Sequence, residues 1–235
     1  MSNVNVIVPY CAGDQHLLAP CLQSLFRFQP DASVALMATH RLTPEQGEAT
    51  VALTKNLDRG SVPCFERNYI QMYPGVAAWA LAGSAEISRT YMEDRPFLYC
   101  EPDVTFTREG CLDSLYTEWS RWGMPVLGAL TQTYPVGLYC NGVAVYGPGA
   151  ILPEGGSVFD ETELTACTEI AFDVQLRHKV LPQMWNTNLI EQVPRTRHWT
   201  DQETTPISAV SVLTHGVKDG SLWEWLKMKR RDSNP

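Results

Sequence analysis

Residues 4–28 read VNVIVPYCAGDQHLLAPCLQSLFRF, in which a strand signal is followed directly by a helix signal. Residues 5–9 form a short apolar run typical of a buried strand, and the Pro9–Tyr10 step and the Cys-Ala-Gly-Asp turn end it. Between residues 17 and 28 apolar side chains recur at helical spacing, namely at Leu18, Cys21, Leu22, Leu25 and Phe26. A buried strand that leads into an amphipathic helix is the repeating unit of an α/β fold.

The same alternation continues through the first half of the chain. We expect strands at residues 34–38, 51–53 and 96–100, a helix whose first turn holds Pro44, a helix in two pieces over residues 65–92, and a helix over 108–122. This order predicts an open, mainly parallel α/β sheet flanked by helices. Ligands bind such sheets beyond the carboxyl ends of strands, so we expect the segments after residues 9 and 100 to border one crevice.

The second half of the chain is less regular. We expect strands at residues 126–131, 142–146 and 210–213, a short helix at 172–180, an irregular stretch at 147–169 and a polar lid at 194–205. A chain of 235 residues without an internal repeat fits one large domain or two small ones, and we expect a single domain over residues 1–235.

Composition and charge restrict the class of protein. The chain is 44% apolar and 19% charged, which is typical of a globular protein, and its net charge of −8 does not indicate a polyanion-binding surface. Seven cysteines without a C-x-x-C pair favour reduced thiols, and the first residues lack the pattern of a signal peptide. The sequence therefore predicts a cytoplasmic protein that has no membrane span.

Two carboxylates end the predicted strand at residues 96–100. Glu101 and Asp103 are separated only by Pro102, a spacing that lets two acids hold one hard cation such as Mg²⁺ or Mn²⁺. An isolated pair of this kind is more often a solvated turn. Its position at the end of a strand in an open α/β sheet favours the metal site here.

A second group of polar residues follows the last predicted strand, in THGVKDGSLW at residues 214–223. His215 is a candidate metal ligand, and Lys218 is a candidate phosphate contact three residues later. A lone histidine is usually an ordinary surface or core residue. The adjacent glycine permits close approach of a charged ligand, which favours a functional role.

Two further residues have a functional and a structural interpretation each. Asp173, in EIAFDVQLRHK, is a candidate general base for an acceptor hydroxyl, but its position also suits a helix N-cap, which the physics alone favours. Arg67, followed by Asn68 at the start of a predicted helix, is equally suited to bind a phosphate or to form a surface salt bridge.

Taken together, these segments resemble GT-A-type nucleotide-sugar glycosyltransferases. The first strand and helix, residues 4–25, resemble the opening of that family, and Glu66-Arg-Asn resembles its A-R-N segment. FLYCEPDVTF resembles the D-x-D strand end, with Glu101 in place of the first aspartate. FDVQLR resembles the E-D-x-x-L-x-x-R segment, and HGVKDGSL resembles the late His-Gly-x-Lys element.

Residues 100–119, CEPDVTFTREGCLDSLYTEW, also resemble a compact subgroup with the pattern E-P-D-x-x-P-x-R-x-G-W-L-D-x-L-x-x-E-Y. That subgroup occurs in bacteria and phages, and some of its members modify bases in DNA. The chain departs from the pattern at Phe106, where proline is expected, and at Cys111, where tryptophan is expected. In a phage-encoded member the site of action would be the host cytoplasm.

The resemblance implies a GT-A-like (Rossmann-like) fold that uses Mn²⁺ or Mg²⁺ and a nucleotide-sugar donor, with a UDP-sugar favoured. Residues 1–125 would be the nucleotide-binding half, and residues 126–235 the acceptor half with the metal and diphosphate element and a basic tail.

The resemblance also implies roles for the residues singled out above. Asp103, Glu101 and His215 would bind the metal, Lys218 and Arg67 the diphosphate, Pro9 and Tyr10 the nucleoside, and Asn141 and Gly142 the sugar or acceptor. Tyr10 would stack on a pyrimidine. Asp173 as the base would make the enzyme an inverting hexosyltransferase.

Several alternatives stay open at this stage. A nucleotidyltransferase uses a related sheet and metal, although C-A-G-D is a poor phosphate loop, and a non-catalytic nucleotide-sugar-binding domain would keep the fold without turnover. The acceptor is either DNA with hydroxymethylated pyrimidines or a saccharide or small hydroxylated molecule. Candidate DNA contacts are Arg195, Arg197, Lys227, Lys229, Arg230 and Arg231.

Overall fold

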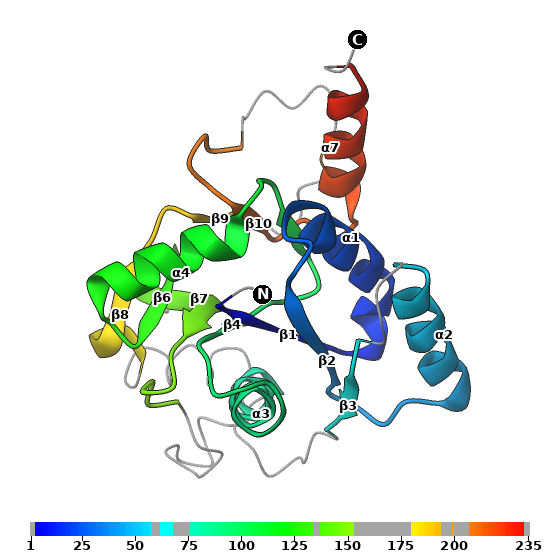
Figure 1. Cartoon of the computed structure of the whole chain (residues 1–235), viewed down its shortest axis with the longest axis horizontal. Helices are drawn as coiled ribbons and strands as arrows, with labels where there is room; N and C mark the ends of the chain where they lie inside the picture. The colour runs from blue at the N-terminus through cyan, green and yellow to red at the C-terminus, as the bar shows by residue number, and fades with distance from the viewer. Residues whose placement is uncertain are drawn as a thin grey trace.

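Strands and helices alternate along the first half of the chain (Figure 1). The computed structural model describes residues 3–57, 62–67, 76–133, 137–152, 180–193, 199 and 207–232. The elements of the first half are β1 (Asn5–Tyr10), the 3-10 helix η1 (Ala12–Leu17), α1 (Leu18–Phe28), β2 (Ser33–Ala38), α2 (Pro44–Lys55), β3 (Cys64–Glu66), α3 (Val76–Tyr91) and β4 (Phe97–Tyr99).

The described part of the second half contributes two long strands, several three-residue strands and two α-helices. Its described elements are β5 (Val104–Phe106), α4 (Cys111–Trp122), β6 (Val126–Thr133), β7 (Gly137–Tyr146), the 3-10 helix η3 (Leu181–Gln183), β8 (Met184–Asn186), β9 (Ile190–Gln192), β10 (Leu213–His215) and α7 (Ser221–Asp232). Among the described residues, no helix is both long and apolar enough to cross a membrane.

The main sheet has seven strands in the order β3-β2-β1-β4-β7-β6-β8. β1 pairs in parallel with β2 and β4, β2 with β3, and β6 with β8, whereas β7 runs antiparallel to both β4 and β6. The prediction of an open, mainly parallel sheet flanked by helices is therefore confirmed. β2 and β4 lie on opposite sides of β1, so the order in which the chain adds strands to the sheet reverses at β1. At such a switch point a crevice forms beyond the carboxyl ends of the strands.

β1 is buried on both faces, which explains its nearly continuous apolar sequence. Its side chains alternate between two cores, with Val6 and Val8 facing α1 and α4 and Ile7 facing α3. Figure 1 shows these helices on opposite sides of the sheet. Most of the apolar stripe of α1 that the sequence predicts, including Leu22 and Leu25, is buried in the first core, and Phe26 packs against that core partly buried.

One predicted strand, at residues 51–53, is wrong because these residues lie inside α2. Thr43 forms a capping box with Gln46, and Pro44 occupies the first turn, as predicted, so the helix has a strong start signal. The short apolar run at residues 51–53 fits a helix as well as a strand, and periodicity alone does not separate the two. In the structure Val51 lies on the exposed side of the helix.

The predicted boundaries around residues 65 and 210 are also wrong. Phe65 belongs to β3, whose residues pair with β2 from Leu36 to Ala38, and this pairing overrides the helical pattern of the sequence. The last strand is β10, which begins at Leu213 rather than at residue 210. The predicted helix at 172–180, most of the stretch 147–169 and most of the lid at 194–205 lie outside the described residues.

A second sheet, in the order β5-β10-β9, joins parts of the chain that are far apart in sequence. β10 runs antiparallel to β5 with His215 opposite Val104, and parallel to β9 with His215 opposite Gln192. Because β5 follows β4 after only four residues, this pairing carries the histidine to the carboxyl end of β4.

Candidate metal and diphosphate site

The carboxyl end of β4 turns directly into the two acids that the sequence singled out. Cys100 donates its N–H to the Ile7 carbonyl at 2.9 Å, and Val104 donates to the Glu101 carbonyl at 3.1 Å, which closes a tight turn between β4 and β5. This turn buries the Asp103 side chain completely and leaves the Glu101 side chain 24% exposed. The turn therefore holds one acid in the protein and the other at the surface of the crevice.

His215 lies between these two carboxylates. Its Nε2 is 3.0 Å from Glu101 Oε2 and 3.1 Å from Asp103 Oδ1. Its Nδ1 is 2.6 Å from Oε1 of Gln192, the residue opposite it in β9. A partner on the second ring nitrogen fixes the orientation of the ring, which is the usual arrangement of a metal-binding histidine.

The turn that follows β10 contains Gly216 and brings Lys218 to the same site. Gly216 has a φ of +113°, and a Cβ there would lie 2.4 Å from the Val193 carbonyl oxygen, so only glycine fits this turn. The turn brings Lys218 Nζ to 2.9 Å from Asp103 Oδ2, while 38% of the lysine side chain stays exposed. We refer to Glu101, Asp103, His215 and Lys218 as the strand-end cluster.

The charges of the strand-end cluster stabilise one another. Burial alone would raise the pKa of Asp103, but the adjacent His215 and Lys218 hold it below its usual value. Burial would likewise lower the pKa of His215, but Glu101 and Asp103 raise it to about 9. The pKa of Lys218 is raised because the attraction of Asp103 exceeds the effect of burial. The cluster is therefore a compact set of two negative and two positive groups.

The cluster also fits a divalent cation. One ligand atom each from Glu101, Asp103 and His215 lies within 4.8 Å of the others. Within the described part of the chain, neither buried Asp103 oxygen has a partner with hydrogen-bond geometry. Its contacts with His215 and Lys218 are therefore charge contacts of suitable distance but poor angle. Two carboxylates and one imidazole suit a cation such as Mn²⁺ or Mg²⁺ that also takes substrate oxygens.

Pro9 and Tyr10 end β1 at the same edge of the sheet, and both are buried. The Tyr10 ring is 2% exposed, its hydroxyl lies 3.2 Å from Thr50 Oγ1, and burial raises its pKa well above the usual value. Stacking of this ring on a base, as the resemblance implies, would therefore require the ring to move.

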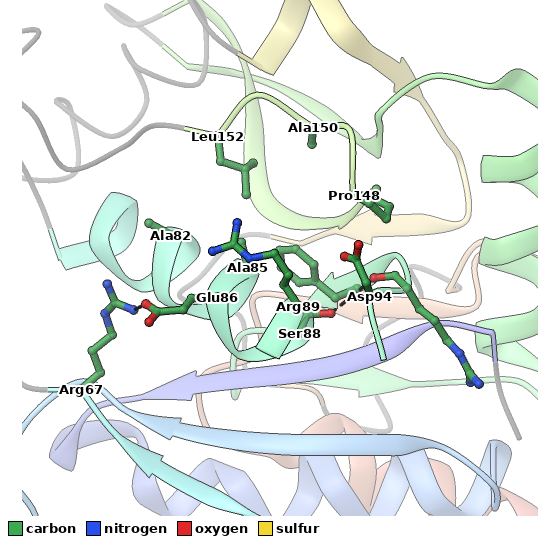
Figure 2. Close-up of a pocket in the computed structure, with 13 residues that line it drawn as sticks. Arg67, Ala82, Ala85, Glu86, Ser88, Arg89, Asp94, Pro148, Ala150 and Leu152 are labelled. Atoms are coloured by element: carbon green, nitrogen blue, oxygen red, sulfur yellow. Dashed lines mark hydrogen bonds and ion pairs between the residues drawn. The ribbon is translucent and has the colours of Figure 1, made fainter. Parts of the chain in front are cut away.

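Arg67 follows β3, and its N–H donates to the Ala38 carbonyl at the end of β2, at 2.8 Å. Its guanidinium group pairs with Glu86 of α3 and lies 5.1 Å from the centre of the Trp79 ring. Figure 2 shows this ion pair at one end of a cavity of about 330 Å³ along α3. Of the two sequence-predicted cations, the structure places Lys218 against the carboxylates and Arg67 against α3.

Asn141 and Gly142 lie in β7, which runs antiparallel to β4 with Ala144 opposite Tyr99. Both residues therefore lie beyond the carboxyl end of β4, on the same edge as Glu101. The side chain of Asn141 is outside the described part of the chain, as are Asp173, Asn68, Arg195 and Arg197.

The structure adds two residues to the site that the sequence did not single out. Gln192 holds the ring of His215, and nothing in its sequence context indicates this, because the contact depends on the pairing of β9 with β10. Asp14, in the turn after β1, is close enough to contribute to the raised pKa of Lys218. Its place after a strand end was the signal that could have identified it.

Comparison with known structures identifies the fold. The chain is similar to a galactosyltransferase LgtC determined with donor and acceptor sugar analogues, with a TM-score of 0.56 and 10% identity over 96% of both chains. It is also similar to mouse xyloside xylosyltransferase 1, with a TM-score of 0.54 and 12% identity over 91% of this chain and 97% of that one.

The glycosyltransferase GlyE of Streptococcus pneumoniae is a third structure of this kind, with a TM-score of 0.55 and 11% identity over 99% of this chain and 64% of that one. The fold is therefore the GT-A-like fold of glycosyltransferases, as the sequence resemblance indicated. Neither a family model nor a curated protein sequence matches this chain.

Proposed function

We propose that this protein is a metal-dependent glycosyltransferase that moves a sugar from a nucleotide-diphosphate sugar to a hydroxyl group of an acceptor. The observation that supports this most strongly is the strand-end cluster. Its four side chains come from two segments more than 100 residues apart, yet they meet within contact distance. They do so at the switch point of a GT-A-like sheet, where ligands of open α/β sheets bind.

Each residue of the cluster has a distinct task in this proposal. Glu101, Asp103 and His215 would hold Mn²⁺ or Mg²⁺, which when bound supplies Lewis-acid stabilisation to the leaving diphosphate. Lys218 has an exposed ammonium end beside Asp103, so it would add positive charge where negative charge develops on the departing phosphate. Gln192 would keep the imidazole oriented.

The donor would be a UDP-sugar, with Pro9 and Tyr10 beside the nucleoside and Gly142 beside the sugar. The support for a nucleotide-sugar donor is the fold together with the LgtC structure, which was determined with donor and acceptor sugar analogues. Arg67 would contribute to the diphosphate site only if it leaves Glu86, because the two side chains are paired in this structure.

The reaction would invert the anomeric centre, with Asp173 as the base that takes the proton of the acceptor hydroxyl. If Asp173 acts in this way, Asp173→Asn should lose nearly all turnover while it keeps affinity for the donor. Retention of configuration in the product would contradict the direct displacement, and full activity of the variant would contradict the role of this residue.

The acceptor would be a hydroxymethylated pyrimidine in DNA or a saccharide hydroxyl. α7 carries Lys227 and Lys229 against the rings of Trp223 and Trp225, so basic groups are fixed on this terminal helix. If they contact DNA phosphates, DNA affinity falls steeply as salt rises. Weak binding that does not respond to salt, together with transfer to a saccharide, would identify the second class of acceptor.

Calorimetric titration with UDP, UDP-glucose and GDP-mannose, with and without Mn²⁺, tests the donor site. We expect metal-dependent binding that Asp103→Asn abolishes. The control Asp94→Asn, which changes an exposed acid before β4, at the opposite end of that strand from Glu101, should leave binding unchanged. Binding without turnover on any acceptor would indicate a non-catalytic domain. Release of pyrophosphate from a nucleoside triphosphate would indicate a nucleotidyltransferase.

A further inference from the structure

His40 lies two residues beyond the end of β2 and has no assigned role in the metal and diphosphate site. Both of its ring nitrogens are buried, and neither has a hydrogen-bond partner among the residues that the structure describes. A neutral imidazole carries one N–H donor and one acceptor, so this side chain leaves both capacities unused. Buried polar groups without a partner are rare in native proteins because leaving them unpaired costs free energy.

The chain around His40 is fixed at the edge of the sheet where the strand-end cluster lies. The preceding residue, Thr39, donates both its N–H and its hydroxyl to the Tyr10 carbonyl, at 2.9 and 3.1 Å. The His40 ring meets the Tyr10 ring edge to face, with 6.3 Å between the ring centres. Its position is therefore set by the ends of β1 and β2, and the unpaired nitrogens do not result from a loose loop.

The spacing of the strands places His40 at a suitable distance from the cluster. β2 and β4 lie on either side of β1, and neighbouring strands are about 4.8 Å apart, so the two strand ends are separated by about 10 Å. A nucleoside diphosphate whose phosphates lie at the strand-end cluster and whose body crosses the end of β1 would bring its nucleoside to the end of β2. A nucleoside carries hydrogen-bond donors and acceptors on its base and its ribose.

We propose that a ring nitrogen of His40 hydrogen-bonds to the nucleoside of the donor, and that this residue selects nucleoside diphosphates over inorganic diphosphate. This inference rests on the proposed function, because it takes the strand-end cluster as the diphosphate site. Both unpaired nitrogens are buried in the free protein, so the His40 ring turns toward the crevice to offer them to the ligand. Binding the nucleoside satisfies them, whereas binding inorganic diphosphate does not.

A purely structural histidine would behave differently from a ligand-binding one. His40→Phe keeps a ring beside Tyr10 but removes both unpaired polar atoms. If His40 serves the ligand, this variant should be as stable as the wild type or more stable when free, because a buried unsatisfied group is lost. If the imidazole stabilises the fold, the variant should instead unfold at a lower temperature.

The test compares two ligands and two proteins by calorimetry in the presence of Mn²⁺. The ligands are inorganic pyrophosphate and whichever of UDP, CDP, ADP and GDP the wild type binds most tightly. We expect His40→Phe to weaken nucleotide binding about tenfold, the usual size of one hydrogen-bond contribution, and to change pyrophosphate binding by less than about twofold. Its unfolding temperature should equal or exceed that of the wild type.

The inference alone would be overturned by equal nucleotide affinity in both proteins, or by an equal loss for nucleotide and pyrophosphate with a lowered unfolding temperature. A wild type that binds pyrophosphate and nucleotides with the same affinity would also overturn it, because the nucleoside would then contribute nothing. A wild type that binds neither class of ligand would contradict the proposed function itself, and the role of His40 would be rejected with it.

Discussion

The strand-end cluster and the surface along α3 differ in how they arrange their charges. In the strand-end cluster, the two carboxylates, the imidazole and the ammonium group meet with Asp103 and His215 fully enclosed. Along α3, by contrast, Arg67 pairs with Glu86, whose side chain is 55% exposed, and Arg95 pairs with Glu93, whose side chain is 70% exposed. Ion pairs therefore occur in both regions, but only one of them is buried.

This difference in burial indicates which of the two sets of charges marks a functional site. Exposed ion pairs contribute little to stability, because water and salt screen them and their side chains lose entropy when they pair. A buried set of charges is expensive to assemble and tends to be found at functional sites. The geometry of the strand-end cluster depends on the β5-β10-β9 sheet and on a turn that only glycine can make. The other two pairs instead join partly exposed side chains at the surface.

The largest expected effect is the difference in lost stability between removing a buried acid of the strand-end cluster and removing an exposed acid just after α3. Asp103→Ala leaves Lys218 and a buried His215 without their partner, so we expect the metal-free protein to lose about 3 kcal/mol of unfolding free energy. Glu93→Ala should cost less than about 1 kcal/mol. Urea denaturation of both variants at pH 6 measures this contrast, and equal losses would show that burial does not distinguish the two regions.

The stability of the metal-free protein should depend on pH through the buried histidine. Glu101 and Asp103 raise the pKa of His215 to about 9, so its stabilising charge is complete below about pH 6.5 and is lost as the pH rises through 9. The contribution of Asp103, whose pKa is lowered, is complete above about pH 4 and is lost on acidification.

Unfolding free energy measured between pH 6.5 and 9.5 should therefore fall, by up to about 3 kcal/mol in the absence of metal. His215→Gln removes the titrating group, so its stability should change much less over the same range. A wild type that is equally stable at both ends of this range would contradict the charge arrangement of the cluster.

The turn at Gly216 should tolerate substitution poorly. Gly216→Ala places a Cβ 2.4 Å from a backbone oxygen at a φ of +113°, and we expect a loss of about 2 kcal/mol together with weaker Mn²⁺ binding. Gly47→Ala is the matched control, because a Cβ there, in α2, meets nothing within 4 Å. That change should stabilise the protein by about 0.5–1 kcal/mol, and a similar effect of both variants would contradict the close packing of the turn.

The smallest expected effect concerns Arg67. Glu86→Gln removes the negative charge that pairs with Arg67 and keeps the shape of the side chain. It should alter the free energy of unfolding by less than about 0.5 kcal/mol, because the pair is exposed. If Arg67 binds the diphosphate, the released guanidinium should strengthen UDP binding severalfold in calorimetry. Unchanged affinity would leave Lys218 as the cation of the donor site and remove Arg67 from it.

The parts of the fold that the sequence predicts correctly are those with strong local signals. The strand and helix at residues 4–28 have clear periodicity, and Thr43 with Pro44 marks the start of a helix. β3 was not predicted, because three residues at an edge carry too little pattern and depend on pairing with β2. The residues of the strand-end cluster were predicted because their positions at strand ends are visible in the sequence.

Contacts across the chain account for what the sequence did not show. Gln192 holds His215 only because β9 and β10 pair, and His40 is notable only because its ring nitrogens are buried without partners. The pairing of Arg67 with Glu86 likewise depends on how α3 packs against the sheet near the end of β3. Periodicity and spacing along one chain carry no information on such contacts.

A crystal grown with Mn²⁺ and UDP, with data collected at the manganese absorption edge, tests the central claim most directly. We predict one strong anomalous peak within coordination distance of Asp103 and His215, with Glu101 bound directly or through water and with UDP phosphate oxygens completing the coordination. A manganese ion bound elsewhere, or a His215 ring that still contacts both carboxylates with no metal between them, would contradict the assignment of this cluster as the metal site.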